Sequence, residues 1–233
     1  MRIIVFFIFS TLVCGCSLSG IEGNGNIVIK EGPLAPFTTL KAGGNFLIDH
    51  KLDSSFSYQL QIDDNLVDYV NLEGIDNTLM VRTSKRVRSS QPIKLIINSP
   101  FPNHIDIAGA IALNGHDYFS NDSLRVSISG ACSATLKLNV AHLHTAMSGS
   151  SRMDINGNAQ KHRLDMAGSS KIDALNLSTE LLNVQIGGAS LARVNVSKTI
   201  NAKPSGAARV EYLGNASINA DDAQNIFIHP YKP

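Results

Sequence analysis

Two pairs of side chains in the second half of the sequence have types and spacings that could do chemistry. Asp154 and Asp173 follow equivalent glycines of a repeat and would lie side by side if successive repeats stack. Paired carboxylates could cleave a glycosidic bond or hold a cation weakly. His142 and His144 are two residues apart, and this spacing places both imidazoles on one face of a strand, within reach of one metal ion.

Neither pair is accompanied by the partners that such a site needs. The aspartates of the repeats (Asp106, Asp154, Asp165 and Asp173) are scattered, so we interpret Asp154 and Asp173 as exposed carboxylates on neighbouring strands. No acidic or cysteine residue accompanies the two histidines in the sequence. A nucleophile elbow, a phosphate loop and a dinucleotide motif are also missing from the sequence. We therefore predict no catalytic, cofactor-binding or metal-binding residue.

A cysteine near the start of the chain has a different chemistry. Met1-Arg2 is followed by an apolar run that ends at Val13-Cys14-Gly15-Cys16, and this order is typical of a secretory signal too short for a stable membrane span. The last four residues resemble a bacterial lipobox, in which Cys16 is the lipid-attachment site. We predict a lipoprotein signal peptide over residues 1–15 and a membrane anchor of acyl chains on Cys16. An ordinary signal peptide or an uncleaved anchor is the alternative.

Two further observations concern this N-terminal region and the remaining thiol. Ser17 follows the cysteine, and since an aspartate there resembles an inner-membrane retention signal, we expect an outer-membrane location if the source is Gram-negative. Cleavage would remove Cys14 and leave Cys132 as the one free thiol, so no intrachain disulfide is expected. We interpret Cys132 as a small buried apolar residue and not as a nucleophile.

The composition favours turns and strands and argues against a nucleic-acid partner. Of 233 residues, 43% are hydrophobic, which is enough for a core, whereas only 17% are charged. The formal net charge is +1, and removal of a segment that contains Arg2 brings it to zero. Proteins that bind nucleic acid through phosphates carry a basic excess, which this composition lacks, so we predict no nucleic-acid binding.

The elements that position these residues are indicated by a repeat of about 20 residues. Six segments align without gaps around Gly109, Gly130, Gly149, Gly168, Gly188 and Gly206: IDIAGAI, VSISGAC, HTAMSGS, LDMAGSS, VQIGGAS and AKPSGAA. Apolar residues recur mainly two and four positions before the glycine, which is the period of a strand with one buried face. The positions on either side of the glycine hold only Gly, Ala or Ser.

Small residues in matching columns indicate tight turns that stack on one another. We therefore predict an all-β fold whose repetitive part, residues 101–233, is a β-solenoid with one coil per repeat. A β-sandwich with regularly spaced strands is the rival, but its antiparallel strands do not require matching columns.

Residues 16–100 are less regular, and we predict a β portion of the same domain there. Gly23-Asn24-Gly25-Asn26 and Gly43-Gly44 are expected to form two further coils. We expect strands around residues 56–62, 79–81 and 93–97, and a short helix that Asp63 or Asp64 caps. The segment KRVRSSQP, residues 85–92, is expected to be an exposed, solvated loop.

The order of these segments resembles a known family. IEGNGNIV, PFTTLKAGGNFLIDH, QIDDNLVDYVNLEGIDNTLMVRT, PIKLIINSP, the glycine turns and EYLGNAS together resemble the bacterial GIN domain, an auto-transporter adhesin head, over residues 21–218. The resemblance implies a right-handed, three-sided β-solenoid on a cell envelope. It departs at Ser148-Gly149-Ser150-Ser151-Arg152, where Ser and Arg replace a second glycine and an aspartate, which weakens any shared ligand site built on such aspartates.

Three functions remain open at this point. The first is a non-catalytic, lipid-anchored envelope adhesin or binding module that presents solenoid faces to envelope polysaccharide or protein. The second is a polysaccharide-active enzyme on the same fold, and the third is a purely structural envelope lipoprotein. A cleft flanked by two carboxylates would favour the enzyme.

Overall fold

The computed structural model describes residues 20–220 and 227–232, and these residues form 18 strands and one 3-10 helix. The N-terminal elements are β1 (Ile21–Glu22), β2 (Ile27–Pro33), β3 (Thr39–Gly44), β4 (Leu47–Leu52), β5 (Ser57–Asp63), η1 (Asp64–Tyr69), β6 (Val70–Ile75), β7 (Thr78–Thr83), β8 (Val87–Arg88) and β9 (Lys94–Ser99). The later strands are β10 (His104–Gly109), β11 (Ala112–Gly130), β12 (Ser133–Met147), β13 (Arg152–Met166), β14 (Lys171–Ile186), β15 (Leu191–Pro204), β16 (Arg209–Leu213), β17 (Ser217–Asn219) and β18 (Ile228–Pro230).

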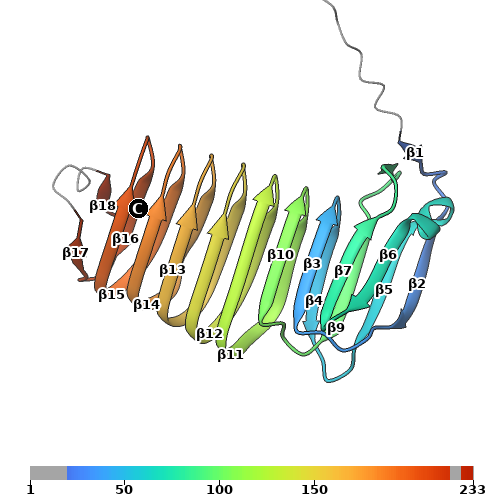
Figure 1. Ribbon diagram of the computed structural model, residues 1–233, viewed down its shortest axis with the longest axis horizontal. Coiled ribbons are helices and arrows are strands. Elements are labelled where there is room, and N and C mark those ends of the chain that lie inside the picture. Colours follow the sequence, from blue (N-terminus) through green and yellow to red (C-terminus); the bar gives the residue numbers. More distant parts are fainter. Residues whose placement is uncertain (1–19, 221–226, 233) are drawn as a thin grey trace, which may run out of the picture.

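The long strands β11 to β15 are successive coils that stack in parallel (Figure 1). Each coil pairs with the next at equivalent positions, such as Met147 with Met166 and Ile172 with Ala192. Parallel pairing in register along the whole stack excludes the β-sandwich, whose neighbouring strands are antiparallel. The predicted β-solenoid is therefore confirmed.

Each coil has three sides, as the coil from Ser151 to Ser170 illustrates. Its buried residues alternate along a first side that ends at Gly157, which has a φ of 120°. The alternation changes phase at Gln160–Lys161, where two exposed residues adjoin, and the third side ends at the turn of Gly168. In Figure 1 the chain rises on the near side, crosses at the glycine turns and descends on the far side as it advances toward the C-terminus, which makes the coil right-handed.

The glycines of the repeat form the tight turns, as the sequence predicts. Gly149 and Gly168 have φ values of 76° and 79°, in the left-handed region that glycine adopts at low cost. A Cβ atom on Gly168 would lie 2.5 Å from the carbonyl oxygen of Gly149, one coil below. The following N–H, that of Ser169, donates to the same oxygen at 2.8 Å. Each turn therefore combines a positive φ with a backbone contact that leaves no room for a side chain.

The N-terminal part is built differently, although one of its predicted coils exists. Gly44 lies in register below Gly109, so residues 39–44 form a coil of the stack as predicted. The prediction of a coil around Gly23–Asn26 is wrong, because β2 pairs antiparallel with β5, and β5 pairs antiparallel with β9. A second antiparallel pair, β6 with β7, joins the stack through β3.

Two smaller N-terminal predictions also need correction. The helix lies where predicted, as η1, but the Asp63 side chain makes no capping hydrogen bond. The carboxylate of Asp63 is buried and instead accepts hydrogen bonds from the backbone N–H of Gly25 and from Ser89 and Ser90. The segment 85–92 is thus not a purely solvated loop, because it holds Asp63 and contributes β8, which pairs with β1.

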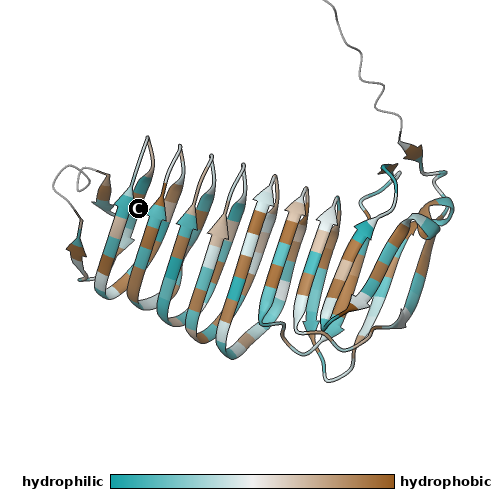
Figure 2. Ribbon diagram, in the orientation of Figure 1, coloured by the Kyte–Doolittle hydropathy of each residue, from teal (hydrophilic) through white to brown (hydrophobic). Residues whose placement is uncertain are grey.

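One continuous apolar core fills the stack (Figure 2). Leu164 and Ile172 are fully buried, and apolar and polar residues alternate along the strands as Figure 2 shows. Amide ladders stabilise the outside, since Asn201 accepts from Asn219 at 2.9 Å and donates to Asn183 at 2.8 Å. The solenoid therefore presents long, regular faces whose side chains repeat once per coil.

Candidate ligand-binding face

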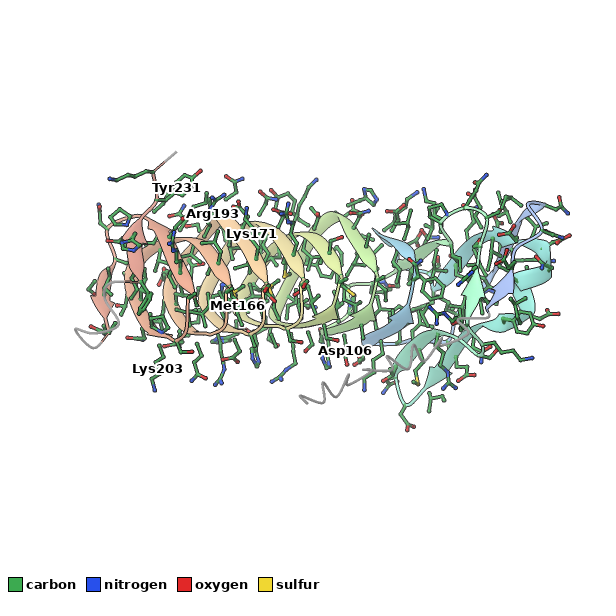
Figure 3. All side chains as sticks on the ribbon, turned by 90° about the horizontal axis from the view of Figure 1, so that it is seen from above. Asp106, Met166, Lys171, Arg193, Lys203 and Tyr231 are labelled. Carbon is green, nitrogen blue, oxygen red and sulfur yellow. The ribbon has the colours of Figure 1, made fainter. Side chains whose placement is uncertain are left out.

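Two long faces of the solenoid point away from each other (Figure 3). We call front face the outward side chains of β3, β10 and the C-terminal segments of β11 to β15, which run up to the glycine turns. Asp106 and Lys203 lie on it. The back face consists of the outward side chains on the N-terminal segments of β11 to β15 and on β16, which follow the turns, and it carries Lys171 and Arg193.

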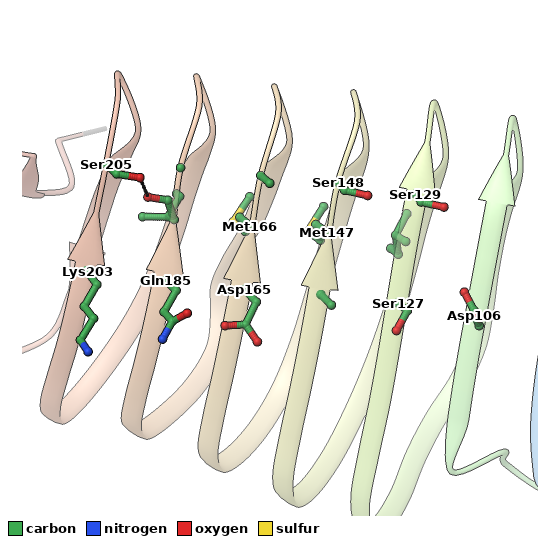
Figure 4. A pocket seen from close by; sticks show the side chains of 15 residues that line it. Asp106, Ser127, Ser129, Met147, Ser148, Asp165, Met166, Gln185, Lys203 and Ser205 are labelled. Atoms are coloured by element: carbon green, nitrogen blue, oxygen red, sulfur yellow. Dashed lines mark hydrogen bonds between the residues drawn. The ribbon is translucent and has the colours of Figure 1, made fainter.

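A shallow groove of about 600 Å³ crosses the front face just below the turns (Figure 4). Its floor is low because the position before each turn glycine holds only small residues, namely Ser129, Ser148, Ala167, Gly187 and Ser205. Larger polar side chains border the groove one row further from the turns: Asp106, Ser127, Asp165, Gln185 and Lys203. The columns of small residues in the sequence therefore shape the outer surface as well as the turn.

A second groove, of about 450 Å³, lies further from the turns, and we call it the basic groove. Its lining includes the cations Arg125, Lys161 and Arg163 and the imidazoles of His104, His142 and His144, whereas the imidazole of His162 is buried beneath it against Thr145. The other residues of its lining are Asn103, Ser123, Leu124, Leu143 and Asn183, so no carboxylate belongs to it. Such a surface favours an anionic ligand.

One carboxylate beside the groove fixes two of its side chains. Asp165 accepts a hydrogen bond from Nε of Arg163 at 2.9 Å and lies 3.0 Å from Nε2 of His144. Burial raises the pKa of Asp165, but the hydrogen bonds from Arg163 and His144 outweigh it and hold this pKa below its usual value. The terminal nitrogens of Arg163 are not used in this pair and are available to a ligand.

The structure places the two predicted histidines on one outward face, as the sequence indicates, but it gives His144 an acidic partner, Asp165, that was not expected from the sequence. His142 and His144 point outward from β12, whereas Leu143, Thr145 and Met147 are buried. No group of three or more His, Cys, Asp or Glu side chains in the described ranges could hold a metal ion. Both histidines instead line the basic groove.

The cations of this groove were missed by sequence reasoning. Arg125 pairs in register with His144, which pairs with Arg163, and His142 pairs with Lys161. These residues occupy the columns five and seven positions before the turn glycines. The same alignment that identifies the turns would have shown them, had those columns been compared.

Asp154 and Asp173 lie in register on neighbouring strands of the back face, as predicted. Both are partly exposed, and the next residue in the row is Arg193. The guanidinium of Arg193 lies 3.7 Å from Asp173 and donates to Glu211 at 2.8 Å, so this cation offsets the negative charge of the neighbouring carboxylates. These contacts support the interpretation of Asp154 and Asp173 as surface carboxylates.

The two cysteines with predicted roles lie in different circumstances. Cys132 is 2% exposed, its Sγ accepts a hydrogen bond from the N–H of Ile111, and burial raises the pKa of the thiol. A raised pKa disfavours the thiolate that a nucleophile needs. The predicted signal peptide over residues 1–15 and the predicted lipid-attachment site, Cys16, lie outside the described residues. In the described part of the chain, no helix is both long and apolar enough to cross a membrane.

Comparison with known proteins identifies the family of the chain. The sequence matches the family described as "Putative auto-transporter adhesin, head GIN domain" over residues 36–216, and no curated protein matches it. A "putative adhesin" from Bacteroides fragilis is 22% identical, with a TM-score of 0.79 over 91% of this chain and 96% of that one.

Two proteins from Parabacteroides distasonis share the fold. A "putative lipid binding protein" is 17% identical, with a TM-score of 0.74 over 92% of this chain and 100% of that one. A "putative adhesin" is 18% identical, with a TM-score of 0.73 over 91% and 98%. At these identities the three structures show only that the fold is shared. The family match, by contrast, covers most of the sequence, and it shows that the chain belongs to the GIN-domain family of adhesin heads.

Proposed function

We propose that the chain is a non-catalytic envelope lipoprotein that acts as an adhesin head and binds its target through the front face. The observation that carries this proposal is the match to the adhesin-head family over residues 36–216. The form of the front face supports it, because a shallow groove lined by small, polar and charged side chains over several coils suits contact with an extended partner.

The anchor completes the proposal. Lipid on Cys16 would hold the chain by its N-terminus, and four residue steps separate Cys16 from Gly20, the first described residue. A fully extended chain covers about 14 Å over that distance. Because β1 lies at one end of the solenoid, the anchor would hold the stack by that end and leave both long faces accessible (Figure 1). Ser17 favours the outer membrane, as argued from the sequence.

Fractionation of cells that express two matched variants tests the anchor. Cys16→Ala removes the acylated thiol, so we expect unprocessed protein or release from the membrane. Cys14→Ala changes a cysteine inside the predicted signal and should leave mature protein in the membrane fraction. If mature-size Cys16→Ala protein stays in the membrane fraction, the anchor is wrong.

An adherence assay tests the role of the front face. We expect beads coated with the full-length protein to bind cells or envelope polysaccharide, and substitutions on the front face to reduce this binding more than equal substitutions on the back face. Equal binding by coated and uncoated beads would contradict the adhesin function and favour a purely structural envelope lipoprotein. Release of sugar from the polysaccharide would identify an enzyme instead.

A further inference from the structure

We propose that the basic groove binds an anionic polysaccharide that carries carboxylate or sulfate groups along its length. The inference rests on the proposed function and assigns the class of ligand that the front face takes. It is carried by the charge of the groove, by a polar atom of His104 that has no partner, and by the direction in which the rows of the front face run.

The charge of the groove differs from that of the whole chain. The chain has 20 Lys and Arg against 19 Asp and Glu, whereas the lining of the groove has three fixed cations and no carboxylate, and the neighbouring Asp165 pairs with one of these cations, Arg163. Arg125 and Lys161 are exposed and Arg163 is half exposed, so their charged ends face solvent. Guanidinium and ammonium groups bind carboxylate and sulfate through charge-assisted hydrogen bonds.

One imidazole of the groove has unused hydrogen-bonding capacity. Nε2 of His104 is buried and has no hydrogen-bond partner among the described residues. His104 pairs in register with Arg125 in the outward column and lines the groove. Buried polar atoms in native structures normally have partners, so this atom indicates a site that is completed by something other than the described chain.

The rows of the front face favour a polymer over a small anion. The row that contains Arg125, His144 and Arg163 continues through Asn183 and Asn201, with one side chain per coil. Parallel strands repeat every ~4.8 Å, so the row offers a regular series of partners along the solenoid axis. Cations would bind the acidic groups of such a chain, and the amides would bind its hydroxyls.

The position of the groove favours a polysaccharide over an anionic membrane. The groove lies along the side of the stack, while β1, the first described strand, lies at one end (Figure 1). A bilayer that holds that end does not run along the front face. The apolar residues of the lining, Leu124 and Leu143, are buried and cannot enter an acyl layer.

Binding of the full-length protein in detergent to polygalacturonate, measured by calorimetry, tests the proposal. Neutral galactan is the uncharged control. A sulfated galactan tests whether sulfate groups bind as carboxylates do, and phosphatidylglycerol vesicles test binding to an anionic membrane. The triple variant Arg125→Gln, Lys161→Gln, Arg163→Gln removes the fixed cations of the groove. Arg152→Gln, Lys171→Gln, Arg209→Gln makes the same change of charge on the back face.

We expect one or both acidic polymers to bind, neutral galactan not to bind, and affinity to fall with added salt. The groove variant should weaken binding by about tenfold or more, and the back-face variant by less than about twofold. Ser123→Lys, which adds a cation at an exposed position of the lining, should strengthen binding. This last variant keeps the test valid if the triple variant fails to fold.

Three results would overturn the inference: equal weakening by both triple variants, equal binding of neutral and acidic polymers, or no binding to any acidic polymer, whether or not the vesicles bind. If coated beads still adhered to cells in that case, the ligand class would be wrong while the adhesin function stood.

Discussion

The two parts of the molecule reach stability in different ways. In the coils from β10 to β16, each residue meets its equivalent one coil away, and the same contact recurs at every level. In the N-terminal part, strands of different sequence pair antiparallel, and the buried Asp63 joins segments that are far apart in the chain. Repetition distributes stability along the stack, whereas the N-terminal part depends on a few unique contacts.

The largest effect is expected where the coils touch most closely. Gly168→Val would place a side chain against the Gly149 carbonyl and would force a β-branched residue to a φ of 79°. We expect a loss of about 3 kcal/mol or more in the free energy of unfolding, measured by chemical denaturation. Lys171→Ala, just past the same turn, should cost less than about 0.5 kcal/mol. Equal midpoints for Gly168→Val and the wild type would contradict the stacked turns.

The next largest effect should be confined to the N-terminal part. Asp63→Ala leaves the donors of Gly25, Ser89 and Ser90 without their acceptor, and we expect a cost of about 2–4 kcal/mol. Hydrogen exchange should increase over residues 20–26 and 86–91 and stay unchanged in the coils. Asp68→Ala, at an exposed position of η1, is the control. Faster exchange spread evenly over all coils would show that the two parts are not independent.

Acid should destabilise both parts through one buried histidine in each. Burial, together with the charge of His144, lowers the pKa of His162 to about 3, and burial lowers that of His50 to about 4, although Asp117 opposes it. The unfolded chain binds these protons near pH 6.5, so stability is fully present above that pH and falls as the pH decreases toward the folded values.

At pH 5 each histidine should cost about 2 kcal/mol relative to pH 7.5. His162→Leu and His50→Leu should each remove about half of this pH dependence, as measured by urea denaturation at the two pH values. Asp63, whose pKa is held below its usual value by the hydrogen bonds from Ser89, Ser90 and Gly25 in spite of its burial, contributes only at lower pH. An unchanged slope in either variant would assign the acid response to other groups.

The smallest effect is expected on the back face. Asp154→Asn with Asp173→Asn relieves repulsion between two carboxylates but weakens the contact of Asp173 with Arg193. We expect a change of less than about 0.5 kcal/mol in stability. Adherence through the front face should be the same as for the wild type. Loss of a polysaccharide-cleaving activity in this variant would favour the enzyme hypothesis.

The same contrast explains how much the sequence predicts. The coils were predicted because stacking places equivalent residues in contact, so Gly149 and Gly168 share a column and a function. The cations of the basic groove lie in columns of the same alignment, so they could have been predicted from it. The role of Asp63 could not have been predicted, because its partners Ser89 and Ser90 are 26 and 27 residues away in a loop with no periodic relation to it. The antiparallel pairing of β2 with β5 was missed for the same reason.

The register of the front face is the claim on which the groove and its proposed ligand depend, and disulfide formation tests it directly. His142 and Lys161 are exposed and pair one coil apart, so His142→Cys with Lys161→Cys should form a bridge on mild oxidation, since the Cα atoms lie ~4.8 Å apart. Ser123→Cys with Lys161→Cys spans two coils, ~10 Å, which exceeds the reach of a disulfide. Mass spectrometry should find the bridge in the first variant alone. A bridge in the second variant, or none in the first, would contradict the register and the site built on it.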